Sequence, residues 1–352
     1  MINMSKAMIA MSGGVDSSVA ALLTLQQGYE AVGATMRLLG DSNNKDISDA
    51  KSVCERLGIE HRVFDMREEF DREVMRRFAD IYLSGETPNP CIICNRFIKF
   101  GALLDRALET GCERIVTGHY ACVRYDSGSG RWLLVKAADR SKDQTYFLYM
   151  LCQEQLSRIV LPVGALSKPE VRELAEQSGF VTSRKHDSQD ICFVPDGDYV
   201  GFLRGYRGMD FAGGDFLDLD GNVIGRHAGA IRYTIGQRKG LGMGFNKPMY
   251  VCRKDMAANT VTLGDNADLF SRRVIVRGVN LIAVSRIDRP MRVTAKIRYS
   301  QREEPATLFQ TGEDELTLVF DSPQRAVAPG QAAVCYDGDC VVCGGRIVRG
   351  EN

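Results

Sequence analysis

Ser12-Gly13-Gly14-Val15-Asp16-Ser17-Ser18 follows an apolar run, Ala7–Met11, and opens a helical pattern. The two glycines permit a positive φ and let a ligand approach the backbone, and the free N–H groups at the start of the next helix attract an anion. The Gly-Lys-Ser/Thr ending of a Walker loop is missing. A plain strand–turn–helix joint is the alternative for a bare Ser-Gly-Gly, but the Val-Asp-Ser-Ser continuation favours a phosphate-binding loop.

Length and composition indicate a multidomain globular protein. With 352 residues, 44% hydrophobic and 26% charged, the chain is expected to form two or three domains. No apolar run approaches membrane-spanning length and the first residues lack a signal pattern, so we expect a cytoplasmic protein with no membrane partner. Eleven cysteines, an odd number in a long chain, indicate reduced thiols rather than a disulfide framework.

The charge is unevenly distributed along the chain. The net charge is zero, yet residues 221–302 hold 16 Lys or Arg against 4 Asp or Glu. This cationic segment suits a polyanion, with scattered solvated charges as the alternative. The expected phosphate contacts are Arg226, Arg232, Arg238, Lys239, Lys247, Arg253, Lys254, Arg272 and Arg273.

The first third of the chain alternates short apolar runs with helical stretches, which predicts an α/β, Rossmann-like parallel sheet. The expected strands are Ala7–Met11, Ala31–Met36, His61–Phe64 and Arg114–Thr117. The expected helices are Ser17–Gln27, Ser48–Leu57, Glu68–Ser84 and Asn95–Thr110. The carboxyl ends of parallel strands share one edge of the sheet, so Ser12–Ser17, Met36 and Gly118-His119 should converge on one crevice.

The pattern changes after the sheet. We expect a hairpin of Ala121–Tyr125 and Trp132–Ala137, then a helix from the capping box of Ser167 and Glu170 to Gly179. Glycines and short strands follow, with a turn at Asp220-Gly221-Asn222. Closely spaced strands near the end, such as Val274–Val276, Arg292–Tyr299, Leu316–Phe320 and Ala332–Tyr336, predict a compact β-barrel. The expected units are therefore residues 1–207, a small β-rich domain of residues 208–272, and a C-terminal barrel of residues 273–352.

Two separated segments carry cysteines in polar surroundings. In Asn89-Pro90-Cys91-Ile92-Ile93-Cys94-Asn95, Asn95 is expected to cap the next helix. Cys94 would then sit just before a helix N-terminus, near Arg96 and Lys99, which lowers a thiol's pKa and makes a nucleophile.

The second segment, Asp187-Ser188-Gln189-Asp190, precedes Cys192, which lies 98 positions after Cys94. It predicts a polar loop with one exposed thiol. Cys91, Cys94 and Cys192 are also enough thiols to hold an iron–sulfur cluster with one open iron, which is an alternative to thiol chemistry. Cys340-x-x-Cys343 lies in a strand pattern and is expected to be structural.

Together these motifs resemble the tRNA-specific 2-thiouridylases, a family of PP-loop ATP pyrophosphatases. The resemblance is carried by Ala10–Ser17, Asn89–Asn95, Thr117–Tyr120, Lys142–Gln144, Asp190–Phe193 and Tyr233–Gly242. It implies an enzyme that replaces the C2 oxygen of the wobble uridine of tRNA by sulfur, with ATP consumed and AMP and pyrophosphate released. Adenylation suits this chemistry, because sulfur does not displace an amide-like oxygen until that oxygen becomes a good leaving group.

The resemblance also implies roles for individual residues. Cys192 would carry a persulfide, loaded by a cysteine desulfurase or a sulfur-relay protein, and Cys94 would be the nucleophile that leaves a Cys94–Cys192 disulfide. ATP with Mg²⁺ would bind at Ala10, Met11, Ser12, Gly13, Gly14, Val15, Asp16, Ser17, Met36 and Gly118. The tRNA anticodon stem-loop would meet Asn89, Pro90, Cys91, His119, Lys142, Asp143, Gln144, Arg298, Tyr299 and Gln331.

Several alternatives stay open at this point. Asp16 suits either a Mg²⁺ ligand or a helix cap. His119 suits either a tRNA contact or a satisfied loop histidine, and the acid–base residue is open because some relatives carry Asp where this chain has Cys91. Another adenylating ligase with the same loop, or an RNA-binding protein with a regulatory nucleotide loop, are the competing functions.

Overall fold

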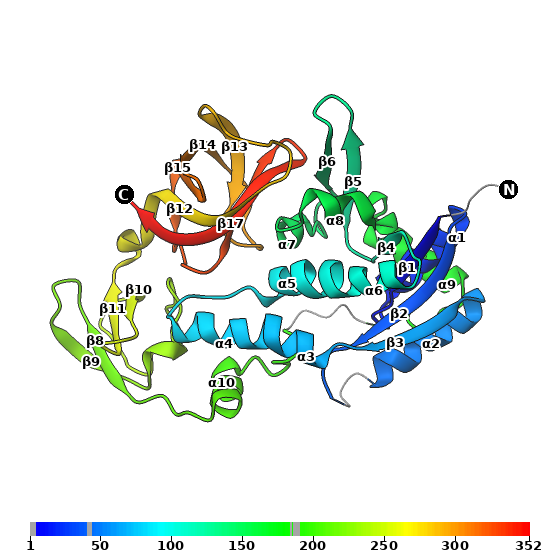
Figure 1. Ribbon diagram of the computed structural model, residues 1–352. Helices are drawn as coiled ribbons and strands as arrows, with labels where there is room; N and C mark the ends of the chain where they lie inside the picture. Colours follow the sequence, from blue (N-terminus) through cyan, green and yellow to red (C-terminus); the bar gives the residue numbers. More distant parts are fainter. Residues whose placement is uncertain (1–4, 41–43, 184, 186–190) are drawn as a thin grey trace.

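The computed structural model describes residues 5–40, 44–183, 185 and 191–352. The predicted segment 187–190 lies outside these ranges. A parallel sheet, a small β-rich module and a barrel follow one another along the chain (Figure 1). In the described part of the chain, no helix combines the length and the apolar character that crossing a membrane requires.

The N-terminal domain is built on a five-stranded parallel sheet of order β3-β2-β1-β4-β7. The predicted Rossmann-like fold is thereby confirmed, and each predicted strand is present within a residue or two. The fifth strand was not predicted. The strands are β1 (Lys6–Ala10), β2 (Glu30–Arg37), β3 (Glu60–Asp65), β4 (Arg114–Val116) and β7 (Ile159–Val160).

Helices connect and cover these strands. The first two, α1 (Val15–Gln26) and α2 (Asn44–Leu57), correspond to the predicted helices. The third prediction is present as α3 (Arg67–Phe70), a π-helical turn η2 (Asp71–Met75) and α4 (Arg76–Leu83).

The fourth predicted helix, Asn95–Thr110, was wrong at its start. It begins at α5 (Pro90–Ile93) and continues through a π-helical stretch, η3 (Cys94–Ala102), into α6 (Leu103–Glu109). Asn89 is extended at the N-cap, and Pro90 starts the helix because its fixed φ suits a first helical position.

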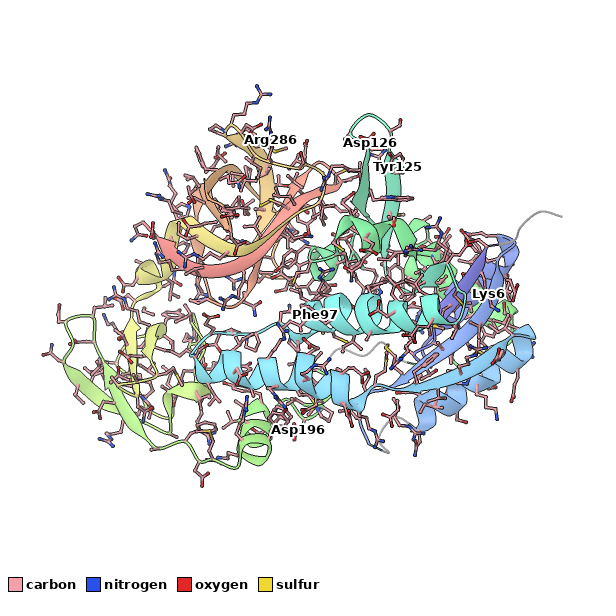
Figure 2. The ribbon with its side chains drawn as sticks, in the orientation of Figure 1. Lys6, Phe97, Tyr125, Asp126, Asp196 and Arg286 are labelled. Carbon is pink, nitrogen blue, oxygen red and sulfur yellow. The ribbon has the colours of Figure 1, made fainter. Side chains whose placement is uncertain are left out.

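The predicted hairpin is formed by β5 (Ala121–Asp126) and β6 (Arg131–Lys136). Its tip, with Tyr125 and Asp126, projects away from the sheet (Figure 2). The chain then forms α7 (Thr145–Leu148), α8 (Gln153–Arg158), η4 (Pro162–Ala165) and α9 (Lys168–Gln177). The predicted capping box of Ser167 and Glu170 starts α9.

The β-rich module begins after α10 (Tyr199–Arg207). Its sheet has the order β10-β11-β8-β9, and the predicted turn at Gly221, with φ +88°, joins β8 to β9. The elements are β8 (Gly214–Leu217), β9 (Val223–His227), η5 (Ala230–Arg232), β10 (Tyr250–Asp255), β11 (Thr260–Gly264) and η6 (Asn266–Leu269).

The C-terminal unit is the predicted barrel. Six antiparallel strands run in the order β12-β15-β14-β13-β16-β17, and β12 pairs with β17 to close the sheet, which leaves no free edge in the ring. The strands are β12 (Phe270–Leu281), β13 (Met291–Lys296), β14 (Glu304–Gly312), β15 (Glu315–Arg325), β16 (Ala332–Asp337) and β17 (Cys340–Glu351).

The barrel and the N-terminal domain share one apolar core. Ile115 of β4, Leu148 of α7 and Val334 of β16 belong to the same buried cluster. The hairpin also reaches the barrel, because Val135 of β6 pairs with Cys340 of β17. The barrel is therefore held firmly against the domain that carries the candidate site.

Candidate functional site

The loop at the start of α1 is shaped by hydrogen bonds within its own strand–loop–helix unit. Ser17 Oγ donates to the Gly14 carbonyl at 3.0 Å, and the Ser12 backbone N–H donates to Ser17 Oγ at 3.2 Å. Gly13 has φ +68°, and a Cβ there would lie 2.5 Å from the Asp46 carbonyl oxygen. The loop thus needs glycine at this position both for its conformation and for the close approach of α2.

The other predicted nucleotide-binding positions lie at the same edge of the sheet. A Cβ on Gly118 would come within 2.6–2.9 Å of Asp16 and Ser17, so the turn after β4 packs directly on the first turn of α1. Met36 is the penultimate residue of β2, which neighbours β1. The carboxyl ends of β1, β2 and β4 therefore lie side by side, as predicted.

Three predicted contacts can offer a ligand little more than backbone. Met11 and Val15 are buried with 2% and 3% of their surface exposed, and the Met11 N–H donates to the Ala34 carbonyl at 2.8 Å. Ala10 is the last residue of β1 and packs against the core. These residues support the loop from beneath.

Asp16 is engaged by two side chains from distant parts of the chain. Lys168 Nζ lies 2.7 and 2.9 Å from its two carboxylate oxygens, and Tyr120 Oη donates to it at 2.8 Å. Gly14 occupies the N-cap of α1 without a side-chain cap, so the helix-cap interpretation of Asp16 was wrong.

Two lysines beside the loop were missed by the sequence reasoning. Lys168 is almost buried on α9, and Lys185 Nζ lies 3.0 Å from the Gly13 carbonyl oxygen and 2.6 Å from Asp46. Both lie more than 150 positions from the loop in sequence, so no local sequence pattern predicts their contacts with it. Each of them is paired with at least one carboxylate, so neither adds an uncompensated positive charge beside the loop.

The three predicted thiols face a common region. Cys91 and Cys192 are exposed and Cys94 is partly exposed. Desolvation is the main reason that the pKa of Cys94 is raised, and the neighbouring Cys192 and Cys91 raise this pKa further. The pKa of Cys192 is raised by desolvation and then by Cys91. The thiols therefore lie within electrostatic reach of one another, although they come from two separate segments.

The predicted activation of Cys94 was wrong. Cys94 has helical φ and ψ angles four residues into the helix, while Asn95 is buried and donates its amide to the Phe147 carbonyl at 3.2 Å instead of capping. The Arg96 guanidinium donates a hydrogen bond to the side-chain oxygen of Gln155. Desolvation raises the pKa of Cys94 to about 12, with only Lys99 acting in the opposite direction, so the free protein holds a thiol here rather than a thiolate.

The residues predicted near the anticodon stem-loop make contacts within the chain. His119 is buried, its Nδ1 lies 2.7 Å from Thr117 Oγ1, and burial lowers its pKa well below the usual value, so its ring is neutral. Asp143 is buried and accepts from the Ala137 N–H at 3.0 Å and from Thr145.

The neighbouring residues Gln144 and Lys142 make different contacts. The Gln144 amide oxygen accepts from the Tyr120 N–H at 2.9 Å, which ties this loop to the turn after β4. Lys142 is half-buried, and its charge lowers the pKa of the nearby Tyr299 against the larger raising effect of burial. Lys142 thus lies near the barrel's exposed aromatic.

The barrel brings three predicted residues to this side of the molecule. Tyr299 is 39% exposed, and its ring lies 4.3 Å from that of Phe147. Arg298 is half-buried and donates to the Arg325 carbonyl. Gln331 Nε2 donates to the carbonyls of Thr87 and Pro88, at 3.0 and 3.3 Å, immediately ahead of Asn89.

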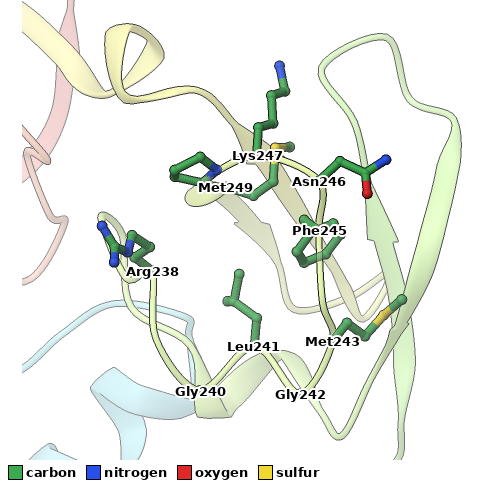
Figure 3. A pocket seen from close by; sticks show the side chains of 10 residues that line it. Arg238, Gly240, Leu241, Gly242, Met243, Phe245, Asn246, Lys247 and Met249 are labelled. Atoms are coloured by element: carbon green, nitrogen blue, oxygen red, sulfur yellow. The ribbon is translucent and has the colours of Figure 1, made fainter.

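A short part of the cationic segment, residues 238–249, lines a hollow in the β-rich module. Figure 3 shows Arg238 and Lys247 on its rim with Leu241 and Phe245 between them, and the hollow measures about 570 Å³. Lys254 was wrongly expected to be free for a phosphate, because its Nζ is buried and burial lowers its pKa to about 8.

Most of the chain matches known families, in three consecutive parts. Residues 5–196 match the "tRNA methyl transferase HUP domain", residues 201–265 the "tRNA methyl transferase PRC-barrel domain" and residues 271–347 the "Aminomethyltransferase beta-barrel domain". The chain is 46% identical to the tRNA-specific 2-thiouridylase MnmA of Acetivibrio thermocellus, over 97% of this chain and 99% of that protein. The chain belongs to the tRNA-specific 2-thiouridylase family. It is therefore a tRNA sulfurtransferase.

A second relative gives the same result, since the MnmA of Clostridioides difficile is 47% identical over 98% of each chain. Among solved structures, a 4-thiouridine synthetase–RNA complex with bound ATP matches with a TM-score of 0.40 and 18% identity, over 57% of this chain and 50% of that one.

A metal cluster among the thiols finds no support in their arrangement. Within residues 5–40, 44–183, 185 and 191–352, no three side chains of His, Cys, Asp or Glu form a group that could hold a metal ion.

Proposed function

We propose that this enzyme adenylates the C2 oxygen of the wobble uridine of tRNA with ATP and replaces it by sulfur from a persulfide on Cys192. The observation that carries the proposal is that a glycine loop before α1 and a pair of thiols within electrostatic reach of each other belong to one chain of the thiouridylase family. We propose that residues 1–207 carry out this chemistry in the cytoplasm, while residues 208–272 and 273–352 hold the tRNA.

The loop supports ATP use through its shape and charge. The positive φ of Gly13 shapes the loop, and the first turn of α1 presents N–H groups that suit an anion. Lys168 and Lys185 lie close by, each paired with a carboxylate. We expect Mg²⁺ to enter with the ATP phosphates, because the Asp16 carboxylate is already bonded to Lys168 and Tyr120.

The sulfur step needs two thiols. The terminal sulfur of the Cys192 persulfide attacks C2 and displaces AMP, which gives a disulfide between Cys192 and the base. The Cys94 sulfur then attacks Cys192 Sγ and gives up its proton. The electron pair of the broken S–S bond stays on the sulfur of the base, which takes up a proton as 2-thiouridine. A Cys94–Cys192 disulfide remains, and a cellular thiol reduces it.

Individual cysteine substitutions test this assignment. Protein purified anaerobically is incubated with ATP, a cysteine desulfurase and unmodified tRNA, and 2-thiouridine is measured by mass spectrometry of nucleosides. We expect Cys94→Ser and Cys192→Ser each to abolish the product, and the matched variant Cys340→Ser, in the barrel, to keep it. Wild-type rates in either site variant would refute the thiol mechanism, and iron in the purified protein would favour the cluster alternative.

A further inference from the structure

The barrel grips the chain segment that leads into the thiol helix. This segment, Glu86–Pro88, connects α4 to α5 and runs beside the barrel (Figure 1). The Thr87 N–H donates to the Pro329 carbonyl at 2.8 Å, and the Gln331 amide donates to the Thr87 and Pro88 carbonyls. Both backbone groups of Thr87 are thus bonded to one barrel loop.

Two further contacts complete the grip. Arg346 of β17 pairs with Glu86. Gly330 has φ +89°, and a Cβ there would lie 2.8 Å from both Glu86 Cβ and the Thr87 nitrogen, so the two backbones touch at a point where no side chain fits.

The barrel side of this joint is rigid. Gly330 N–H donates to the Ile347 carbonyl at 2.9 Å, and Ile347 N–H donates to the Gln331 carbonyl at 2.7 Å. These bonds anchor the loop to β17, which pairs with strands on both sides in the closed barrel. A displacement of the barrel is therefore passed on to Glu86–Pro88.

The thiol side of the joint is stiff as well. Pro88 and Pro90 fix φ on either side of Asn89, and Cys91 and Cys94 follow within the same helix. The path from the Gln331 contact to Cys91 thus crosses three residues, two of which are prolines, and it has little conformational freedom to absorb a shift.

We propose that the barrel loop 328–331 is a clamp that positions Cys91 and Cys94, and that Gln331 is a positioning residue for the thiolation step. The inference deepens the proposed function and rests on it for its catalytic consequence. It couples the position of the barrel to the alignment of the nucleophile, because loop 328–331 bonds directly to the segment that leads into the thiol helix.

The test measures thiol reactivity and catalysis separately in Gln331→Leu, which keeps the side chain's bulk and removes its donor. Alkylation by iodoacetamide is followed for each cysteine peptide by mass spectrometry, without ATP or tRNA, with Cys340 as the internal reference. We expect loosening of the helix to speed alkylation of Cys94 by about threefold or more, with Cys340 unchanged. Single-turnover thiolation at saturating tRNA should fall about tenfold, with the Kd for tRNA unchanged.

A control and a second variant keep the result interpretable. Gln310→Leu, on an exposed position of β14, should leave all three measurements unchanged. Arg346→Gln removes only the ion pair to Glu86 and should shift Cys94 alkylation in the same direction by a smaller factor.

Two results would overturn the clamp. In one, Gln331→Leu weakens tRNA binding while Cys94 alkylation stays at the wild-type rate, which makes Gln331 a tRNA contact alone. In the other, neither alkylation nor thiolation changes. If the wild type forms no 2-thiouridine, the proposed function fails, but the alkylation comparison still decides whether the clamp exists.

Discussion

The phosphate-binding loop and the thiol helix both belong to the candidate site, yet they are held in place in different ways. The loop Ser12–Ser17 takes its shape from bonds such as Ser17 Oγ to the Gly14 carbonyl, within one strand–loop–helix unit. The thiol helix is entered through a segment whose backbone bonds to the barrel, more than 240 positions later. The backbone shape of the loop therefore rests mainly on local bonds, although Lys185 and Gly118 also contact it, whereas the approach to the thiol helix rests on a distant domain.

The largest expected effect comes from a substitution beside the phosphate-binding loop. In Gly118→Ala the new Cβ must displace the first turn of α1, because it would lie within 2.6–2.9 Å of Asp16 and Ser17. We expect thiolation to fall about a hundredfold, with a loss of about 1–3 kcal/mol in the free energy of unfolding by urea.

The matched control for this variant is Gly205→Ala, in α10, where a Cβ meets nothing within 4 Å. It should leave thiolation unchanged. Alkylation of Cys94 should stay at the wild-type rate in Gly118→Ala, and a large change there would show that the two regions are not independently supported.

The pH dependence of Cys94 alkylation tests the second region, the thiol helix. Because the pKa of Cys94 is raised to about 12, its thiol loses a proton only at high pH, and the thiolate fraction grows with each pH unit below that value. We expect Cys94 alkylation in the free enzyme to rise about tenfold per unit from about pH 7 to about pH 9, without a plateau. A plateau near neutral pH would contradict the raised pKa.

The smallest expected effect concerns neither region but the basic loop of the β-rich module that we expect to contact tRNA. Arg238 and Lys239 are exposed on the loop around the hollow of Figure 3. Replacing Arg238 by Gln should weaken tRNA binding modestly and reduce the slope of log K against log salt by about 1. The control, Arg286→Gln, changes a charge at the outer end of the barrel (Figure 2). An equal loss of slope in this variant would show that the effect of Arg238 on tRNA binding is not specific to its loop.

The sequence predicted the sheet well because each βα unit carries its own signals. Ala7–Met11 is a buried strand with a glycine loop behind it, and β1 is found at Lys6–Ala10. The strand β7 was missed because two residues, Ile159 and Val160, leave no periodicity to read. The start of the thiol helix was misread at Asn95, since a proline at the first helical position outweighed an Asn cap five residues later.

The candidate site residues divide in the same way, into those whose roles depend on nearby residues and those whose roles depend on distant segments. Gly13 and Ser17 could be assigned from the motif, because their roles are backbone conformation and bonds a few residues away. Lys168 was invisible, since only the packing of α9 against α1 brings it to Asp16. The contact of Gln331 with Thr87 was equally beyond reach, because it joins two domains.

The sequence by itself determined the fold class and the glycine loop after β1, since these depend on local conformation and residue type. A shared role of Cys91, Cys94 and Cys192 in thiol chemistry remains a prediction. Only the tertiary structure decided that Cys94 is a desolvated thiol, that Asp16 is paired with Lys168 and that the barrel holds the approach to the thiol helix. The physical reason is that desolvation and charge pairing are set by neighbours in space, and these neighbours come from segments far apart along the chain.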